Sequence, residues 1–228
     1  MTKKIIFVIV EGPSDDDSLG IFFDKYYAAY HVEIKVMFGD ITTAKGVKST
    51  NILSKVADVV KGYAKNNHLT KNNFQEIIHI VDTDGAYIPD NLIIEDVNIG
   101  GTTYNLDSII CKNKNSIVER NKQKRMNINK LINCGYIRTN IPYKIYYMST
   151  NLEHVLHNIQ NTTDEEKEKL AFQFLKKYKD NLHEFLDYIC NSSFSVKKDY
   201  LESWEFIKDG NNSLNRHTNL GLSLNKKK

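Results

Sequence analysis

Two short acidic segments, each at the end of an apolar run, constrain the fold of this chain more than any other feature. The first run, residues 5–10, is followed by Glu11-Gly12-Pro13-Ser14-Asp15, and the second, residues 77–81, is followed by Asp82-Thr83-Asp84-Gly85. Apolar runs rich in β-branched residues and bounded by Gly or Pro are typical of strands buried in a parallel sheet. Ligands of such sheets bind beyond the carboxyl ends of the strands. The sequence therefore predicts four carboxylates at one edge of a sheet, those of Glu11, Asp15, Asp82 and Asp84.

These four carboxylates predict a metal site. Asp82 and Asp84 are two residues apart at a strand end, so their side chains point to the same side of the sheet. Carboxylates gathered in one place repel one another unless a cation lies among them. Carboxylate oxygens are typical ligands of hard cations. We therefore expect Mg²⁺ or Mn²⁺ to bind here, with Gly85 allowing a sharp backbone turn after the second aspartate.

The elements around the two segments favour a parallel α/β sheet. Apolar residues recur at helical spacing over residues 15–30 and 50–66, whereas residues 32–38 alternate between apolar and polar as a strand does. Alternating strands and helices imply parallel strands joined by right-handed crossovers. Strand character returns at residues 143–148.

The prediction divides the chain into a core and a helical extension. The core spans residues 1–160 and contains a basic insertion at about residues 100–140. The extension, residues 161–228, is a C-terminal subdomain in which residues 163–208 are expected to be helical. The predicted fold is α/β, with a parallel sheet of about four strands, flanking helices and a helical C-terminal extension.

Together, the two motifs resemble those of the Toprim domain. The shared pattern is an apolar strand followed by Glu-Gly-x-x-Asp and, after two crossovers, an apolar strand followed by Asp-x-Asp-Gly. Toprim domains occur in topoisomerases, bacterial primases, ribosomal-RNA maturases and the overcoming-lysogenization-defect nucleases. The resemblance implies that Glu11 is a general acid/base and that Asp82 and Asp84 hold magnesium. The acid that the lysogenization-defect branch carries four residues after the glutamate would be Asp15.

A later segment resembles a narrower group of Toprim proteins. Residues 145–157 contain a predicted strand, then Asn151-Leu152-Glu153, a predicted helix and a histidine. This order is similar to that of small Toprim proteins from bacterial abortive-infection and restriction loci, which are candidate phage-defence nucleases and are sometimes paired with an ATPase. The resemblance implies a further metal ligand at Glu153, a nucleic-acid substrate and an ATPase partner. An acid that merely starts a helix is an equally ordinary explanation of Glu153.

Basic side chains supply the candidates for substrate binding. The stretch 112–130 holds basic residues throughout and a single acid, Glu119. A stretch of this kind either tracks a phosphate backbone or forms a solvated helix face. The polar segment 213–219 leaves a similar choice between a phosphate contact and a capped surface turn. The candidate substrate-binding residues are Lys45, Lys48, Arg120, Lys124, Arg125, Arg216 and His217.

Three functions are compatible with the acidic motifs. A metal-dependent nuclease acting on DNA or RNA is favoured, because metal ions stabilise the charge that develops on a phosphodiester during hydrolysis. The segment Asp82-Thr83-Asp84-Gly85 also resembles the nucleophile loop of haloacid-dehalogenase phosphatases, with Asp82 as nucleophile and Asp84 as general acid. That alternative lacks a convincing acidic pair at a later strand end and leaves Glu11 unexplained. The third alternative is a non-catalytic Toprim protein that binds nucleic acid or an ATPase.

Composition and cysteine usage bear on the compartment. The apolar run at residues 5–10 is too short to span a membrane, and no signal-peptide cleavage site follows it. Cys111, Cys134 and Cys190 are far apart and form no CxxC pair, which favours reduced thiols over a zinc site. The formal net charge of +3 is mild. We therefore expect a cytoplasmic protein without membrane association.

Overall fold

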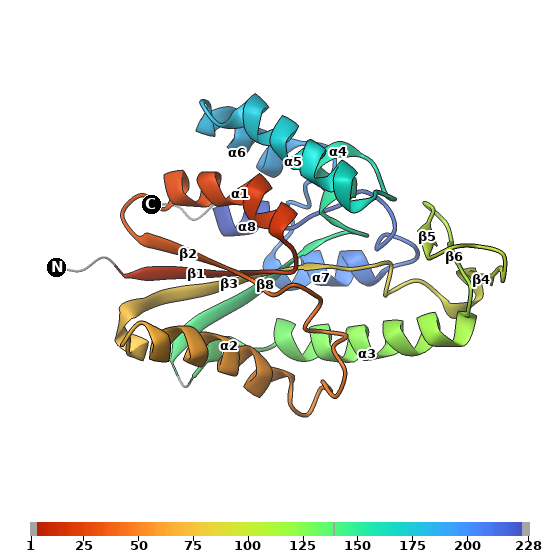
Figure 1. Ribbon diagram of the computed structural model, residues 1–228, viewed down its shortest axis with the longest axis horizontal. Coiled ribbons are helices and arrows are strands. Elements are labelled where there is room, and N and C mark those ends of the chain that lie inside the picture. The colour runs from red at the N-terminus through yellow and green to blue at the C-terminus, as the bar shows by residue number, and fades with distance from the viewer. Residues whose placement is uncertain (1–3, 139, 225–228) are drawn as a thin grey trace.

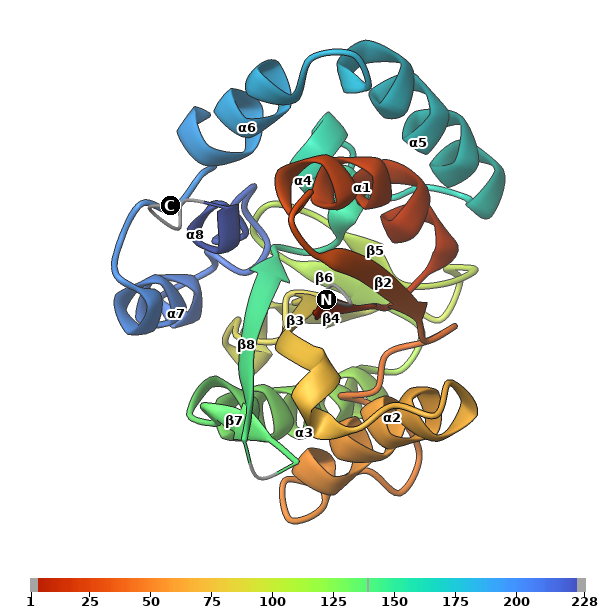
Figure 2. The same ribbon diagram turned by 90° about the vertical axis from the view of Figure 1, so that its left-hand side faces the viewer.

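The computed structural model describes residues 4–138 and 140–224, and its centre is a five-stranded sheet (Figure 1, Figure 2). The strand order is β2-β1-β3-β8-β7; the first four strands are parallel, and β7 is antiparallel to β8. The predicted α/β class with a mostly parallel sheet is confirmed, and the edge strand β7 is an addition that the sequence did not predict. The strands are β1 Ile5–Val10, β2 His31–Val36, β3 Phe74–Asp82, β7 Tyr136–Ile137 and β8 Ile141–Met148.

Helices cover both faces of this sheet. Figure 1 shows α1, α4, α5 and α6 over one face and α2 and α3 over the other, while Figure 2 shows α7 beside the β8 edge. Of the helices in the described part of the chain, none combines the length and apolar character needed to cross a bilayer. The helices are α1 Pro13–Tyr26, α2 Ile52–Asn66, α3 Lys114–Ile132, α4 Leu152–His157, α5 Asp164–Tyr178, α6 Leu182–Asn191, α7 Tyr200–Lys208 and α8 Gly221–Leu224, with short 3₁₀ turns at Lys71–Asn73 and Asp90–Leu92.

Alternation of side chains along the central strands builds one hydrophobic core on each face. Phe7 of β1 belongs to the core that α2 and α3 cover, whereas Val8 belongs to the core beneath α1. Every residue of β1 is buried, because a central parallel strand is covered on both faces. In the second core, Phe22 of α1 stacks on Phe185 of α6 with ring centroids 4.0 Å apart. The two cores hold the strand ends, and the residues that follow them, in fixed positions.

The segment between β3 and β8, which contains the predicted basic insertion, forms a small second sheet and a long helix. The sheet has the order β4-β6-β5, with β4 at Ile93–Glu95, β5 at Thr103–Tyr104 and β6 at Ile109–Cys111. Helix α3 begins after Asn113, whose side chain accepts a hydrogen bond from the Ser116 N–H at 2.9 Å. Figure 1 shows the small sheet beyond the carboxyl ends of the central strands. Helix α3 runs back from there past those strand ends.

The C-terminal residues pack on the same sheet as the core. Thr163 and Glu166 form a capping box at the start of α5. Farther along, the Tyr147 N–H of β8 donates to Asn219 Oδ1 at 2.8 Å. Phe185 of α6 and Trp204 of α7 lie in the two cores described above. Residues on the two sides of the predicted boundary at 160/161 therefore share the two hydrophobic cores.

Candidate active site at the carboxyl edge of the sheet

Each of the four parallel strands carries an acidic residue at or soon after its carboxyl end. Glu11 follows β1, Asp82 is the last residue of β3, and Glu153 lies in the first turn of α4, after β8. The Asp82 N–H donates to Glu11 Oε1 at 3.1 Å, so the two predicted motifs are in direct contact. Asp40, in the loop after β2, was not among the candidates from sequence, and the structure adds it to this edge.

Asp15 contributes to both the helix and the edge. Its carboxylate Oδ2 accepts a hydrogen bond from the Gly12 N–H at 2.7 Å, and Gly12 is the N-cap of α1. Asp15 is also buried, and it lines a cavity together with Glu11 and Asp82. Asp15 therefore caps α1 and also lies among the other acids.

Four of the five predicted metal ligands line a cavity of about 440 Å³. We call Glu11, Asp15, Asp82 and Glu153, which all line it, the cavity acids. The Ser14 hydroxyl donates to Glu153 Oε1 at 3.4 Å, which ties the start of α1 to the start of α4. Lys167 of α5 also lines this cavity and brings a positive charge to it. The fifth predicted ligand, Asp84, belongs to a separate group.

Asp84 is bound to a buried lysine rather than to the cavity. Lys124 of α3 is 0% exposed, and its Nζ contacts Asp84 Oδ2 and lies 2.9 Å from Asp40 Oδ2. The same nitrogen is 3.9 Å from Glu11 Oε1. We call Asp40 and Asp84 the lysine-paired acids. Sequence analysis assigned Lys124 to substrate binding, but its ammonium is directed at these carboxylates and is closed off from solvent.

Arg120 holds the backbone turn that carries Asp84. Its guanidinium donates to the Asp84 carbonyl oxygen at 2.9 Å and to the Tyr104 hydroxyl at 2.8 Å. Asp84 and Gly85 both have positive φ, of 48° and 62°. A Cβ at residue 85 would lie 2.5 Å from a Leu214 methyl carbon, so this turn requires glycine. The predicted sharp turn after Asp84 is therefore present, and Arg120 stabilises it.

The pKa values of these acids shift in opposite directions. Burial raises the pKa of Asp82 well above its ordinary range, and neighbouring carboxylates, first among them Glu11, raise it further. Burial likewise raises the pKa of Glu11, despite the opposing charge of Lys124. Burial raises the pKa of Asp15 to about 7, with the hydrogen bond from Gly12 opposing it. For Asp40, burial is outweighed by Lys124 and by hydrogen bonds from Thr42, and the pKa is lowered.

Donor chemistry makes the cavity acids the best candidates for a metal ion. They present oxygen donors only, which suit Mg²⁺ or Mn²⁺ better than zinc or copper. The raised pKa values of Glu11, Asp15 and Asp82 mean that the ionised forms of these three groups lack sufficient compensating charge, which a divalent cation would supply. Within the described residues, however, no three His, Cys, Asp or Glu side chains come close enough together to hold an ion. A site with three or more protein ligands would therefore need these side chains to move toward one another.

The remaining predicted substrate contacts do not line the cavity of the cavity acids, and several of them are engaged with protein groups. Lys45 and Lys48 are exposed in the loop between β2 and α2. Arg125 donates to the Ala86 carbonyl oxygen at 3.2 Å. Arg216 donates to the Val155 carbonyl oxygen at 2.8 Å, and His217 packs edge-on against an aromatic ring. Residues 213–219 thus form a turn, as one of the two alternatives predicted, but Ser213, Leu214, Thr218 and Asn219 are buried rather than at the surface.

Sequence reasoning could have found Asp40 but not Tyr104. Asp40 follows a predicted strand, so the rule that selected Glu11 and Asp82 applies to it equally. Tyr104 reaches the edge from the two-residue strand β5, and its hydroxyl lies 3.5 Å from Asp84 Oδ1. A strand of that length leaves no periodic pattern in a sequence.

Comparisons with known proteins identify no relative of this chain. No protein-family model matches it, and neither a curated protein nor a solved structure does so. The Toprim resemblance therefore depends on the acidic motifs and their strand context.

Proposed function

We propose that this protein is a Toprim-type nuclease that hydrolyses phosphodiester bonds in DNA or RNA with Mg²⁺ or Mn²⁺. The observation that carries the proposal is the meeting of Glu11 and Asp82, from adjacent parallel strands, at a cavity that Asp15 and Glu153 also line. Open α/β sheets bind their ligands at this edge. Clustered carboxylates without full countercharge favour a cationic cofactor, and a bound cation in turn attracts a phosphodiester.

The cavity acids would hold the metal ion. When bound, the ion supplies Lewis-acid stabilisation of the phosphoryl oxygens and favours ionisation of a water nucleophile. Glu11 is suited to proton transfer, because burial raises its pKa toward the range in which a carboxyl group can both release and accept a proton. The Asp82 N–H holds one carboxylate oxygen of Glu11 in place, which fixes the orientation of this group.

Lys124 reduces the negative charge at the edge without occupying the cavity. Its pKa is raised well above the ordinary value, because Asp40, Asp84 and Glu11 outweigh the cost of burial. The ammonium is therefore charged at any working pH. A polyanionic substrate that approaches the edge meets fewer uncompensated carboxylates as a result. We assign Lys124 the role of a positioning residue that fixes Asp40 and Asp84.

Cleavage assays test the proposal directly. Wild type, Asp82→Asn and Asp58→Asn would be incubated with end-labelled DNA and RNA in Mg²⁺, in Mn²⁺ and in EDTA. Asp58 is an exposed acid on α2, so its variant controls for the loss of one negative charge. We expect metal-dependent cleavage by wild type and Asp58→Asn, and loss of cleavage in Asp82→Asn. Equal cleavage by all three proteins, or cleavage that persists in EDTA, would contradict the proposal.

A non-catalytic role is the second candidate, and one observation favours it. In the described residues, no group of three or more His, Cys, Asp or Glu side chains is arranged to hold an ion. A protein that only binds nucleic acid or an ATPase would not need such a group. Titration with Mn²⁺, followed by electron paramagnetic resonance, separates the two functions. A nuclease should bind Mn²⁺ in wild type and lose that binding in Asp82→Asn. Nucleic-acid binding without Mn²⁺ binding or cleavage would establish the alternative. The phage-defence role and the ATPase partner remain predictions from the resemblance.

A further inference from the structure

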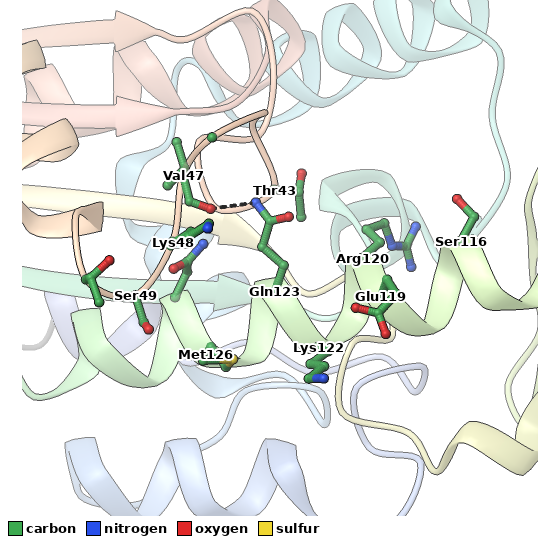
Figure 3. A pocket seen from close by; sticks show the side chains of 13 residues that line it. Thr43, Val47, Lys48, Ser49, Ser116, Glu119, Arg120, Lys122, Gln123 and Met126 are labelled. Carbon is green, nitrogen blue, oxygen red and sulfur yellow. Dashed lines mark hydrogen bonds between the residues drawn. The ribbon is translucent and has the colours of Figure 1, made fainter.

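A second, larger cavity lies beside the candidate active site. Its volume is about 790 Å³, within the range of roughly 300–1,000 Å³ that is common for pockets that bury small molecules. The loop 43–50 forms one wall and α3 forms the other (Figure 3). Gln123 joins the walls, because its Nε2 donates to the carbonyl oxygens of Ala44 at 3.1 Å and Val47 at 2.9 Å. The cavity is thus a braced feature rather than a gap under a loose loop.

The walls combine the groups that a nucleotide requires. Lys48 on the loop and Lys122 on α3 are exposed, so their ammonium groups can reach a phosphate. Met126 is 51% exposed and offers an apolar surface to a base or a sugar. Glu119 is the acid among the lining residues, so positive charge prevails when Arg120 is included. A purely apolar ligand would leave these charges without a partner.

Asn127 adds a specific acceptor to the cavity lining. Its side chain is 0% exposed, and its Nδ2 donates to the Thr42 carbonyl oxygen at 2.6 Å. That bond identifies which end of the amide is oxygen. Within the described residues, Asn127 Oδ1 has no hydrogen-bond partner. A buried acceptor left unpaired costs free energy, which a ligand with an N–H donor would recover.

The cavity and the acidic edge share helix α3. Lys124, which binds Asp40 and Asp84, lies between Gln123 and Asn127 in the sequence. Arg120 belongs to both places, since it lines the cavity while donating to the Asp84 carbonyl oxygen. A chain with one phosphate at the carboxyl edge would therefore place a neighbouring nucleotide over this helix.

We propose that the cavity between loop 43–50 and α3 binds one unpaired nucleotide of the substrate strand. Lys48 and Lys122 contact its phosphates, and Asn127 Oδ1 accepts a hydrogen bond from an exocyclic amine of its base. A base must be unpaired to enter such a cavity, which makes single-stranded nucleic acid the substrate class. This inference rests on the proposed nuclease function and names the substrate of that site.

Binding measured without cleavage tests the phosphate contacts. Fluorescence anisotropy with a labelled single-stranded oligonucleotide in EDTA would compare wild type, Lys48→Ala/Lys122→Ala and Lys61→Ala/Lys65→Ala. The second pair lies on exposed positions of α2 and removes the same charge outside the cavity. We expect only the cavity pair to weaken binding strongly, and to lower the slope of log Kd against log salt by about 2. Equal binding by both double variants would overturn the proposal.

The base contact is tested with two pyrimidine homopolymers. Oligo(dC) carries an exocyclic amine on every base, whereas oligo(dT) has a carbonyl at the same position. We expect wild type to bind oligo(dC) about fivefold more tightly, and the preference to disappear in Asn127→Leu, with thermal unfolding checking that this variant folds. Equal affinities in wild type would overturn the assignment of Asn127.

These measurements separate the inference from the proposed function. Oligonucleotide binding that depends on the cavity lysines, in a protein that cleaves nothing, would contradict the nuclease proposal and leave the nucleotide cavity standing. Cleavage that depends on Asp82, together with oligonucleotide binding that does not depend on the cavity lysines, would support the nuclease proposal and contradict the nucleotide cavity. A wild-type protein that binds no single-stranded oligonucleotide would overturn the nucleotide cavity, whereas the nuclease proposal would still be decided by the cleavage assays.

Discussion

The acidic edge of the sheet has two parts that differ in their countercharge. The lysine-paired acids, Asp40 and Asp84, share the ammonium of buried Lys124. The cavity acids face one another instead, and for Asp15 the charge of Lys167 is outweighed by burial. Both parts are withdrawn from water, yet the pKa of Asp40 is lowered and that of Asp82 is raised. Lys124, together with hydrogen bonds from Thr42, therefore favours the ionised form of Asp40, whereas Asp82 has no comparable partner among the described residues.

Glu11 lies between the two parts, and its pKa shows whether Lys124 or burial has the larger effect on it. Its Oε1 is 3.9 Å from Lys124 Nζ, and it also accepts the Asp82 N–H. Burial nevertheless raises its pKa, and Asp40, Asp84 and Asp15 add to that effect. An ammonium shared among three carboxylates cannot fully compensate the most distant of them. The comparison predicts a proton or a metal ion in the cavity, but not at Asp40.

Removing the lysine should produce the largest effect. Lys124→Met keeps the length and apolar stem of the side chain but leaves the partly exposed Asp40 and Asp84 without a cation. We expect the free energy of unfolding to fall by about 3–5 kcal/mol in urea denaturation at neutral pH. Lys122→Met, an exposed position two residues earlier on α3, serves as the control and should change it by less than about 0.5 kcal/mol. A Lys124→Met protein as stable as the control would show that the lysine is not the deciding charge.

Two matched substitutions should then move stability in opposite directions. Asp40→Asn leaves Lys124 with one fewer buried partner and should destabilise by about 3 kcal/mol. Asp82→Asn removes a carboxylate whose charged form is disfavoured, so it should stabilise the metal-free protein by about 1 kcal/mol. Both changes preserve side-chain size, and both are read from urea denaturation in EDTA. Shifts of the same sign would mean that the two parts of the edge do not differ as described.

The meeting of the two motifs was predictable, because it follows from strand order alone. Apolar runs at residues 5–10 and 77–81 identify buried parallel strands, and the carboxyl ends of such strands lie at one edge. Glu11 and Asp82 come into contact there. Asp84 was expected beside Asp82, but the turn at Gly85, held by Arg120, directs it to Lys124 instead. Local spacing could not reveal a partner that comes from a helix forty residues farther along.

The inward position of Lys124 could not be predicted from sequence, because polar residues interrupt the buried face of α3. Asn121, Lys124 and Asn127 are buried at helical spacing between Ile117 and Ile128. A search for an apolar stripe finds little there, so the helix resembles a solvated basic segment. The small second sheet escaped prediction for another reason: its strands have only two or three residues.

The change in the free energy of unfolding with pH should be the smallest of these effects. It tests most directly whether the cavity acids and the lysine-paired acids differ. Folding raises the pKa of Asp15 from its ordinary value of 3.8 to about 7, mainly by burial. The folded protein therefore holds a proton that the unfolded chain has released, and Asp15 contributes stability that is complete below pH 3.8 and is lost as the pH rises toward about 7. The contribution falls by up to about 1.4 kcal/mol per pH unit in that window.

Asp15→Asn should flatten this slope, since asparagine does not titrate and its side-chain oxygen can still accept the Gly12 N–H. Urea denaturation at several pH values in EDTA measures the slope, and Asp58→Asn should keep the slope of wild type. Asp40, whose pKa is lowered, acts in the opposite sense: its contribution is present above its ordinary value of 3.8 and is lost only as the pH falls below that. A slope unchanged by Asp15→Asn would show that water or a counter-ion already compensates the cavity acids, and the distinction between the two parts of the edge would then rest on Asp40 and Asp84 alone.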